Sequence, residues 1–274
     1  VERSRGLGDV YKRQRIYCMK ILNLSEIDSS WVFNVLNIYN FNKPGPYEFI
    51  FDFLCEKGKF IEGNVLEAGT YKGRMSIALS IFISHLKLDK TLHTFDTFSG
   101  FPSYHENDQQ LKFDELFKTG QISQDQFNQI CKLRKIRQSL THQEITTNNI
   151  STSGNFSNSS LDEVISKIDL LGLENIIVHE GTFKETMSSF SLENEKYCLA
   201  FIDCDLYDGY IQSLNHVWPR MQRGGIVFLD EYYSLKFPGA FIATNEYLKN
   251  WTDYEKINVA SKGDDFQRWV LVKK

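Results

Sequence analysis

The sequence predicts an α/β fold with a parallel sheet and helices on both faces. Short apolar segments alternate along the chain with segments whose apolar residues recur at helical spacing. This alternation is typical of βαβ units, in which successive strands lie parallel. Aspartates directly follow three of the apolar segments, and glycines follow another, as at the ligand-binding edge of open α/β sheets. With 274 residues, 42% of them hydrophobic, the chain can bury a sizeable core.

Two helices are expected before the first strand, at residues 29–40 and 47–56, separated by Pro44 and Pro46. The first strand (64–68) turns at Gly69 to Gly73 into a helix that reaches about residue 85. The later elements are expected in this order: strand 91–95, helix 161–171, strand 176–179, helix 184–190, strand 198–202, helix 209–221, strand 226–229, helix 243–251 and strands 256–260 and 267–272.

The segment from residue 103 to residue 160 interrupts this alternation. It is polar, shows only weak helical patterns at 111–117 and 123–140, and ends in a Ser/Thr/Asn-rich stretch. An irregular excursion of this length within a domain is usually a lid or a substrate-binding insertion. We therefore divide the chain into a helical cap (15–62) and a catalytic domain (63–274) with an insertion. Residues 1–14 show no periodicity and are expected to be a non-native or disordered segment.

Composition excludes several classes of protein. The formal net charge is −4 and no basic block occurs, which disfavours binding to nucleic acids or to anionic membranes. No apolar run approaches the roughly 18 residues that a membrane-spanning helix needs. Five scattered cysteines without a C-x-x-C pair support neither a disulfide framework nor a zinc site, and no secretory signal is evident, so a cytoplasmic location is expected.

The strongest local signal is V-L-E-A-G-T-Y-K-G at residues 65–73. A strand that carries an acid and then leads through glycines into a helix lets the backbone approach a nucleotide-like ligand closely. The pattern differs from the dinucleotide signature G-x-G-x-x-G, which disfavours a nicotinamide or flavin enzyme. A plain strand–turn–helix joint is the structural alternative. Asp96, at the end of the second strand, could accept hydrogen bonds from both hydroxyls of a ribose, or could cap a helix.

Two acidic clusters follow later strands, Asp203 with Asp205 and Asp230 with Glu231. If these strands neighbour the first one, the carboxylates converge, and their repulsion must be relieved by a cation or a proton. Oxygen ligands without histidine or cysteine suit Mg²⁺, Ca²⁺ or Mn²⁺. The alternative is that these acids are solvated loop residues.

Several segments together resemble the macrocin O-methyltransferase family of class I S-adenosylmethionine-dependent methyltransferases. They are E-A-G-T-Y-K-G, F-D-T-F-S-G-F-P, H-E-G-T-F-K-E-T, D-C-D-L-Y, W-P-R-M and G-G-I-V-F-L-D-E-Y, in this order between residue 64 and about residue 245. The resemblance implies a Rossmann-like, seven-stranded methyltransferase sheet. It also implies S-adenosylmethionine as cofactor, with Glu67 and Gly69 at the methionine end, Asp96 at the ribose and Gly181 to Phe183 near the adenine.

The resemblance also implies Mg²⁺ at Asp203, Asp230 and Glu231, although the family usually has aspartate at the last position. Asp203 and Asp205, or His142 from the insertion, are the candidate catalytic residues, with Asp205 or His142 taking the proton. His142 could equally be a solvated loop residue. The full set of predicted cofactor-binding residues is Glu67, Ala68, Gly69, Thr70, Tyr71, Gly73, Asp96, Thr97, Ser99, Gly100, Gly181, Thr182, Phe183 and Asp203.

The expected reaction is methylation of a hydroxyl on a sugar or related small molecule, such as a natural product or a glycan. In-line attack on the methyl group requires both reactants to be held in near-attack geometry. A catechol-like or other small acceptor is a second possibility, and a nucleotide-binding module without turnover is a third. A homodimer or a higher homo-oligomer is also considered.

Overall fold

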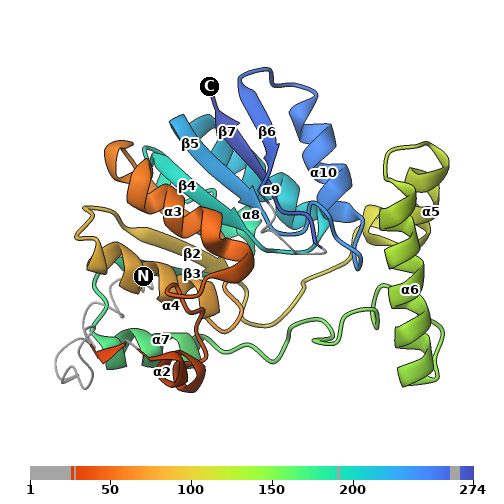
Figure 1. Ribbon diagram of the computed structural model, residues 1–274, viewed down its shortest axis with the longest axis horizontal. Coiled ribbons are helices and arrows are strands. Elements are labelled where there is room, and N and C mark those ends of the chain that lie inside the picture. The colour runs from red at the N-terminus through yellow and green to blue at the C-terminus, as the bar shows by residue number, and fades with distance from the viewer. Residues whose placement is uncertain (1–25, 28, 190–191, 260–265) are drawn as a thin grey trace, which may run out of the picture.

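The computed structural model describes residues 26–27, 29–189, 192–259 and 266–274, so the predicted 1–14 segment lies outside the described residues (Figure 1). In the described part of the chain, one seven-stranded sheet has the order β3-β2-β1-β4-β5-β7-β6. Strands β1 to β5 pair in parallel, whereas β7 is antiparallel to both β5 and β6. The strands are β1 (Asn64–Ala68), β2 (Leu92–Asp96), β3 (Ile176–Glu180), β4 (Tyr197–Ile202), β5 (Met221–Leu229), β6 (Tyr254–Asn258) and β7 (Trp269–Lys273).

The strand order reverses between β1 and β4. From β1 the chain moves outward to β2 and β3, then returns to β4 on the other side of β1 and continues to β5. Ala68 pairs with Ile202 at the carboxyl ends of β1 and β4. Open α/β sheets bind their ligands at such a reversal, because the loops that follow the two strands diverge there and leave a crevice.

Helices cover both faces of the sheet, as expected. Alternate residues of a strand point to opposite faces, and Val65 and Leu66 of β1 accordingly belong to different hydrophobic clusters. The first cluster also contains buried residues of α2 (Ser30–Leu36), α3 (Glu48–Glu56), α4 (Arg74–His85) and α7 (Leu161–Leu171). The second contains those of α9 (Tyr207–Val217) and α10 (Gly239–Leu248). The N-terminal helices therefore pack into the same core as the sheet.

The insertion forms two helices, α5 (Leu111–Lys118) and α6 (Gln124–Thr141), followed by an irregular return to α7. Figure 1 shows α6 at the edge of the molecule, away from the sheet. Four buried residues of this segment (Phe113, Leu116, Ile122 and Ile130) form a small cluster that packs against Leu235, Phe241 and Ile242. No helix in the described part of the chain is long and apolar enough to cross a lipid bilayer.

Several element boundaries differ from the prediction. Helix α2 ends at Leu36 because Asn37 adopts a left-handed conformation (φ 51°). Strand β5 begins at Met221, five residues earlier than predicted, because the chain leaves α9 at Val217 and Met221 already pairs with Tyr197 of β4. The predicted helix 184–190 ends outside the described residues, and in the described part it is the single turn α8 (Phe183–Thr186).

Candidate functional site

A cavity of about 510 Å³ opens at the carboxyl ends of the parallel strands. Its wall includes the glycine loop after β1, Asp96 after β2, and the acidic residues after β4 and β5. Tyr39 and Tyr47 reach it from the N-terminal cap, and Phe156 reaches it from the insertion. Ligand sites in proteins are typically concave spaces of about 300–1,000 Å³, so this cavity can take a small ligand.

The glycine loop lies directly against the end of β4. Gly69 has φ 99°, and a Cβ there would overlap the backbone carbonyl of Asp203. The two segments are joined by a hydrogen bond from the Asp203 amide to the Ala68 carbonyl (2.8 Å). Glycine is needed here because any side chain would push the loop away from β4. The loop backbone thus borders the cavity directly.

Glu67 is a buried acid at the floor of the cavity, with 1% of its surface exposed. Its Oε2 accepts hydrogen bonds from the hydroxyls of Thr94 (2.8 Å) and Ser76. Burial raises the pKa of Glu67 to about 8, although these hydrogen bonds act in the opposite direction. These two hydrogen bonds fix the orientation of the Glu67 carboxyl.

Asp96 connects the loops that follow β1 and β2. Its Oδ2 accepts a hydrogen bond from the Tyr71 amide (2.8 Å), and its Oδ1 accepts one from the Phe98 amide (2.7 Å). Both donors have left-handed backbones, with φ 50° at Tyr71 and φ 52° at Phe98. A carboxylate has further lone pairs on each oxygen, so Asp96 can still accept hydrogen bonds from two ligand hydroxyls.

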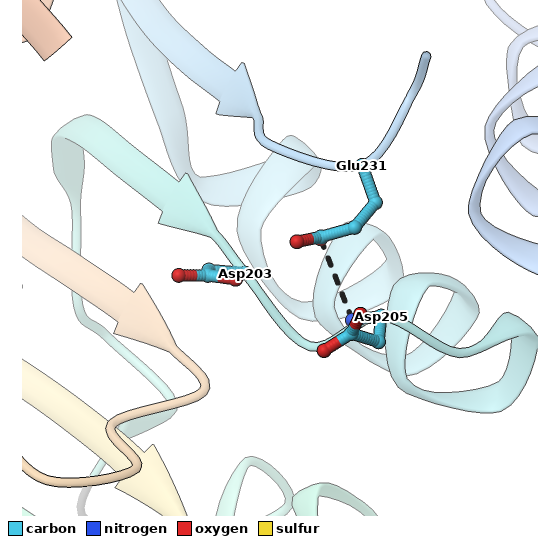
Figure 2. A group of neighbouring side chains, drawn as sticks. All are labelled: Asp203, Asp205 and Glu231. Atoms are coloured by element: carbon cyan, nitrogen blue, oxygen red, sulfur yellow. Dashed lines mark hydrogen bonds between the residues drawn. The ribbon is translucent and has the colours of Figure 1, made fainter. Parts of the chain in front are cut away.

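Asp203, Asp205 and Glu231 form a cluster of three carboxylates, which we call the carboxylate group (Figure 2). One oxygen from each side chain lies within 4.8 Å of the other two. The Asp205 amide donates to Glu231 Oε2 (3.4 Å), and the Tyr210 hydroxyl donates to the same oxygen (3.0 Å). Asp205 holds a left-handed backbone (φ 60°), which a non-glycine residue rarely adopts. Burial raises the pKa of all three carboxyls, and the Asp230 carboxylate adds to the rise at Asp203.

Two cations accompany these acids. Lys236 Nζ lies 3.5 Å from Asp205 Oδ1, and Arg268 Nε lies 3.3 Å from Asp230 Oδ1. The pKa of Lys236 is raised, mainly by Asp205, so the amine stays protonated. Asp230 lies outside the three-residue carboxylate group.

Carboxylate oxygens are the donors that Mg²⁺ prefers, and Asp205 Oδ1 is buried without a hydrogen-bond partner in the described structure. The residues present therefore fit a divalent cation. The oxygens that converge belong to Asp203, Asp205 and Glu231, and Asp230 Oδ1, which also has no hydrogen-bond partner in the described structure, lies next to them in sequence.

Comparison with known proteins gives the family. Residues 66–232 match a family model described as a methyltransferase domain. The chain belongs to this methyltransferase family. It is also 24% identical over 188 residues to mycinamicin III 3''-O-methyltransferase of Micromonospora griseorubida, a match that covers 68% of this chain and 61% of that protein.

Two solved structures show the same fold as this methyltransferase. The O-methyltransferase NovP superposes with a TM-score of 0.57 at 18% identity, over 83% of this chain and 78% of its own. The calicheamicin methyltransferase CalS11 superposes with a TM-score of 0.52 at 17% identity, over 99% of this chain and 94% of its own. The predicted family and the Rossmann-like, seven-stranded methyltransferase fold are thus confirmed.

Most of the predicted cofactor-binding residues of the methyltransferase line the cavity: Glu67, Gly69, Thr70, Tyr71, Asp96, Thr97, Gly100, Thr182, Phe183 and Asp203. Ala68, Gly73, Ser99 and Gly181 are not among its lining residues. Ala68 is fully buried in β1, and Gly73 packs against Val164 where it precedes α4. The Ser99 side chain is exposed to solvent.

His142 stands apart from the cavity. It is exposed and follows α6 with a left-handed backbone (φ 54°), at the end of the helix that projects from the molecule. It is not among the residues that line the cavity. The structure therefore does not bring His142 to the cavity, whereas Asp203 and Asp205 line it.

Several residues that line the cavity of the methyltransferase were not predicted from the sequence. Tyr39 and Tyr47 contact each other through their hydroxyls (3.4 Å), and the Arg74 guanidinium lies 4.5 Å from the centre of the Tyr39 ring. Two of these residues had a signal in the sequence, since each is a cation close to a predicted site residue. Arg74 directly follows Gly73, and Lys236 lies six residues after Asp230. Nothing in the local pattern of the two tyrosines indicates that they reach the cavity.

Proposed function

We propose that the protein transfers the methyl group of S-adenosylmethionine to a hydroxyl of a small-molecule acceptor, with assistance from Mg²⁺. The proposal rests on one observation above all. The carboxylate group of Asp203, Asp205 and Glu231 faces the same cavity as the glycine loop and Asp96. A place suited to a nucleoside and a place suited to a cation are therefore adjacent, as methyl transfer to a coordinated hydroxyl requires.

The cofactor would lie along the carboxyl ends of β1 and β2. The backbone of Gly69 permits close approach, and Asp96 is placed to accept hydrogen bonds from the ribose hydroxyls. Thr182 and Phe183 border the cavity beyond Asp96, where the adenine would lie. S-adenosylmethionine supplies an activated methyl group on a sulfonium, and the protein supplies its orientation.

The acceptor would lie between the carboxylate group and the insertion. Asp203, Asp205 and Glu231 are the residues that would hold Mg²⁺, which lowers the pKa of a coordinated hydroxyl. Asp205 is the candidate to receive the proton of the attacking hydroxyl. Phe101 and Phe156 form an apolar wall on the insertion side, with 5.0 Å between their ring centres, and would exclude water from this space.

A sugar hydroxyl of a natural product is the acceptor that we favour. The curated relative is named as a methyltransferase of the 3''-oxygen of mycinamicin III, and CalS11 as a calicheamicin methyltransferase. A Mg²⁺ ion held by the carboxylate group would bind two adjacent hydroxyls of the acceptor, and both sugars and catechols offer such a pair. A catechol-like acceptor is therefore the alternative that the test must separate.

Calorimetric titration with S-adenosylmethionine, with and without Mg²⁺ and with NAD as the control, tests the cofactor. We expect binding of S-adenosylmethionine but not of NAD. Mass spectrometry of glycosides and catechols incubated with cofactor and enzyme then tests the acceptor. Methylation of catechols alone would contradict the sugar acceptor. Binding of S-adenosylmethionine without methylation of any acceptor would favour a nucleotide-binding module. Absence of S-adenosylmethionine binding would contradict the proposed function.

A further inference from the structure

Lys236 places an ammonium group at the edge of the carboxylate group. It lies six residues beyond Asp230, on the segment that leads from β5 to α10, and its side chain borders the cavity. Its Nζ is 3.5 Å from Asp205 Oδ1, an oxygen that is buried and has no hydrogen-bond partner in the described part of the protein. The ammonium is therefore the positive partner of an acid that is also a candidate metal ligand.

The two cations near the acids differ in how firmly they are held. The Arg268 side chain is 12% exposed and faces Asp230, which lies outside the three-residue carboxylate group. The Lys236 side chain is 37% exposed and flexible, so it has room to move away from Asp205 when another cation takes its place. Of the two cations, only Lys236 contacts a carboxylate that is also a candidate metal ligand, namely Asp205.

We infer that Lys236 is the built-in counter-ion of this site: it neutralises Asp205 while no divalent cation is bound, and it weakens the binding of that cation. The inference rests on the metal site in the proposed function. Two positive charges a few ångströms apart in a buried site repel each other strongly, so the ammonium must move when a divalent cation enters.

The displaced ammonium has a second partner nearby. Lys236 Nζ lies 5.9 Å from the centre of the Phe156 ring, within the range of a cation–π contact. Phe156 belongs to the insertion and lines the same cavity. Movement of Lys236 from Asp205 toward Phe156 would keep the charge partnered and would link occupation of the metal site to the acceptor side of the cavity.

Calorimetric titration of the purified protein with MgCl₂ tests the inference, because its readout is affinity and not turnover. Lys236→Met keeps the length of the side chain and removes its charge, and we expect it to tighten Mg²⁺ binding about tenfold. Lys184→Met is the matched control, since Lys184 lines the same cavity but forms no ion pair with any residue that the structure describes. We expect this control to change the affinity less than about threefold.

Lys236→Arg keeps the charge and should leave the affinity close to that of the wild type. Should Lys236→Met fail to fold, as judged by thermal unfolding, Lys236→Gln serves in its place. Unchanged or weaker Mg²⁺ binding in the uncharged variant, or an equal gain in Lys184→Met, would overturn the inference.

Titration of the same samples with S-adenosylmethionine separates this failure from failure of the proposed function. One outcome is that the wild type and both uncharged variants bind S-adenosylmethionine but none of them binds Mg²⁺. This result would overturn both the inference and the metal site, but it would not contradict the proposed methyl transfer. Absence of cofactor binding would contradict the transferase itself.

Discussion

Arg268 forms an ion pair with Asp230, with 3.3 Å between Nε and Oδ1. The sheet register brings the two residues together. Leu229 of β5 pairs with Trp269 of the antiparallel strand β7, so the residue after Leu229 and the residue before Trp269 lie side by side. The pairing of β7 with β5 therefore places Arg268, the residue before β7, next to the acidic residue that follows β5.

Arg268→Met should destabilise the protein by about 2–3 kcal/mol, because it leaves the Asp230 carboxylate without its cation beside three other carboxyls. Both side chains are largely buried, at 12% and 15% exposure, so solvent screens the lost pair only partly. Urea unfolding at pH 7.5 measures the change. The double variant Asp230→Asn/Arg268→Met should recover most of the loss. Equal instability of the single and double variants would show that the arginine acts through other contacts.

Asp205→Asn should weaken Mg²⁺ binding at least about tenfold, and Asp230→Asn less than about threefold. The reason is geometric, since Asp205 belongs to the group of oxygens within 4.8 Å and Asp230 does not. Each variant removes one negative charge near the site. A difference between the two variants therefore reports which side chain binds the ion, and not the loss of charge alone. Calorimetry with MgCl₂ checks the result. The reverse order would favour Asp230 as the ligand, as predicted from the sequence.

Asp96→Ala should weaken the binding of S-adenosylmethionine at least about tenfold, because it removes the acceptor of ribose hydrogen bonds and releases the Tyr71 and Phe98 amides that it holds. Glu180→Ala is the control. Glu180 pairs with Asp96 in the sheet register, yet it is exposed and does not line the cavity. Calorimetric titration should find the control unchanged. Equal affinities for Asp96→Ala and the wild type would remove Asp96 from the proposed site.

Elements with clear local signals could be predicted from the sequence. Strand β1 and helix α7 have the predicted bounds, since glycines flank the apolar run of β1, and Ser160 and Gly172 bound α7. Strand β5 was predicted too short. Gly224 and Gly225 lie within it and suggest a loop, and its early part is set by pairing with β4, which depends on tertiary structure.

The candidate site could be predicted in part, for a related reason. Carboxylates at the ends of parallel strands must meet at one edge of the sheet, so Glu67, Asp96 and Asp203 were found. The cations that pair with these acids could not be predicted, because they depend on tertiary structure. The register of β7 places Arg268 beside Asp230, and the path of the loop after β5 places Lys236 beside Asp205. The position of His142 could not be predicted, because nothing local to it shows that α6 lies at the edge of the molecule, away from the sheet.

Two buried histidines, His179 and His216, should each contribute a loss of stability as the pH falls from about 6.5 to about 4, whereas the buried carboxyls with raised pKa, such as Glu67, contribute in the opposite direction. Burial lowers the pKa of His179 and of His216 to about 4, so the unfolded chain binds more protons in this range and stability rises with pH. Urea unfolding at pH 7.5 and pH 5.0 measures the net change in stability, to which each histidine should contribute a loss of about 2 kcal/mol. His216→Gln should reduce this loss, whereas His85→Gln, at an exposed position, should not. An equal loss in wild type and His216→Gln would assign the acid sensitivity to other groups.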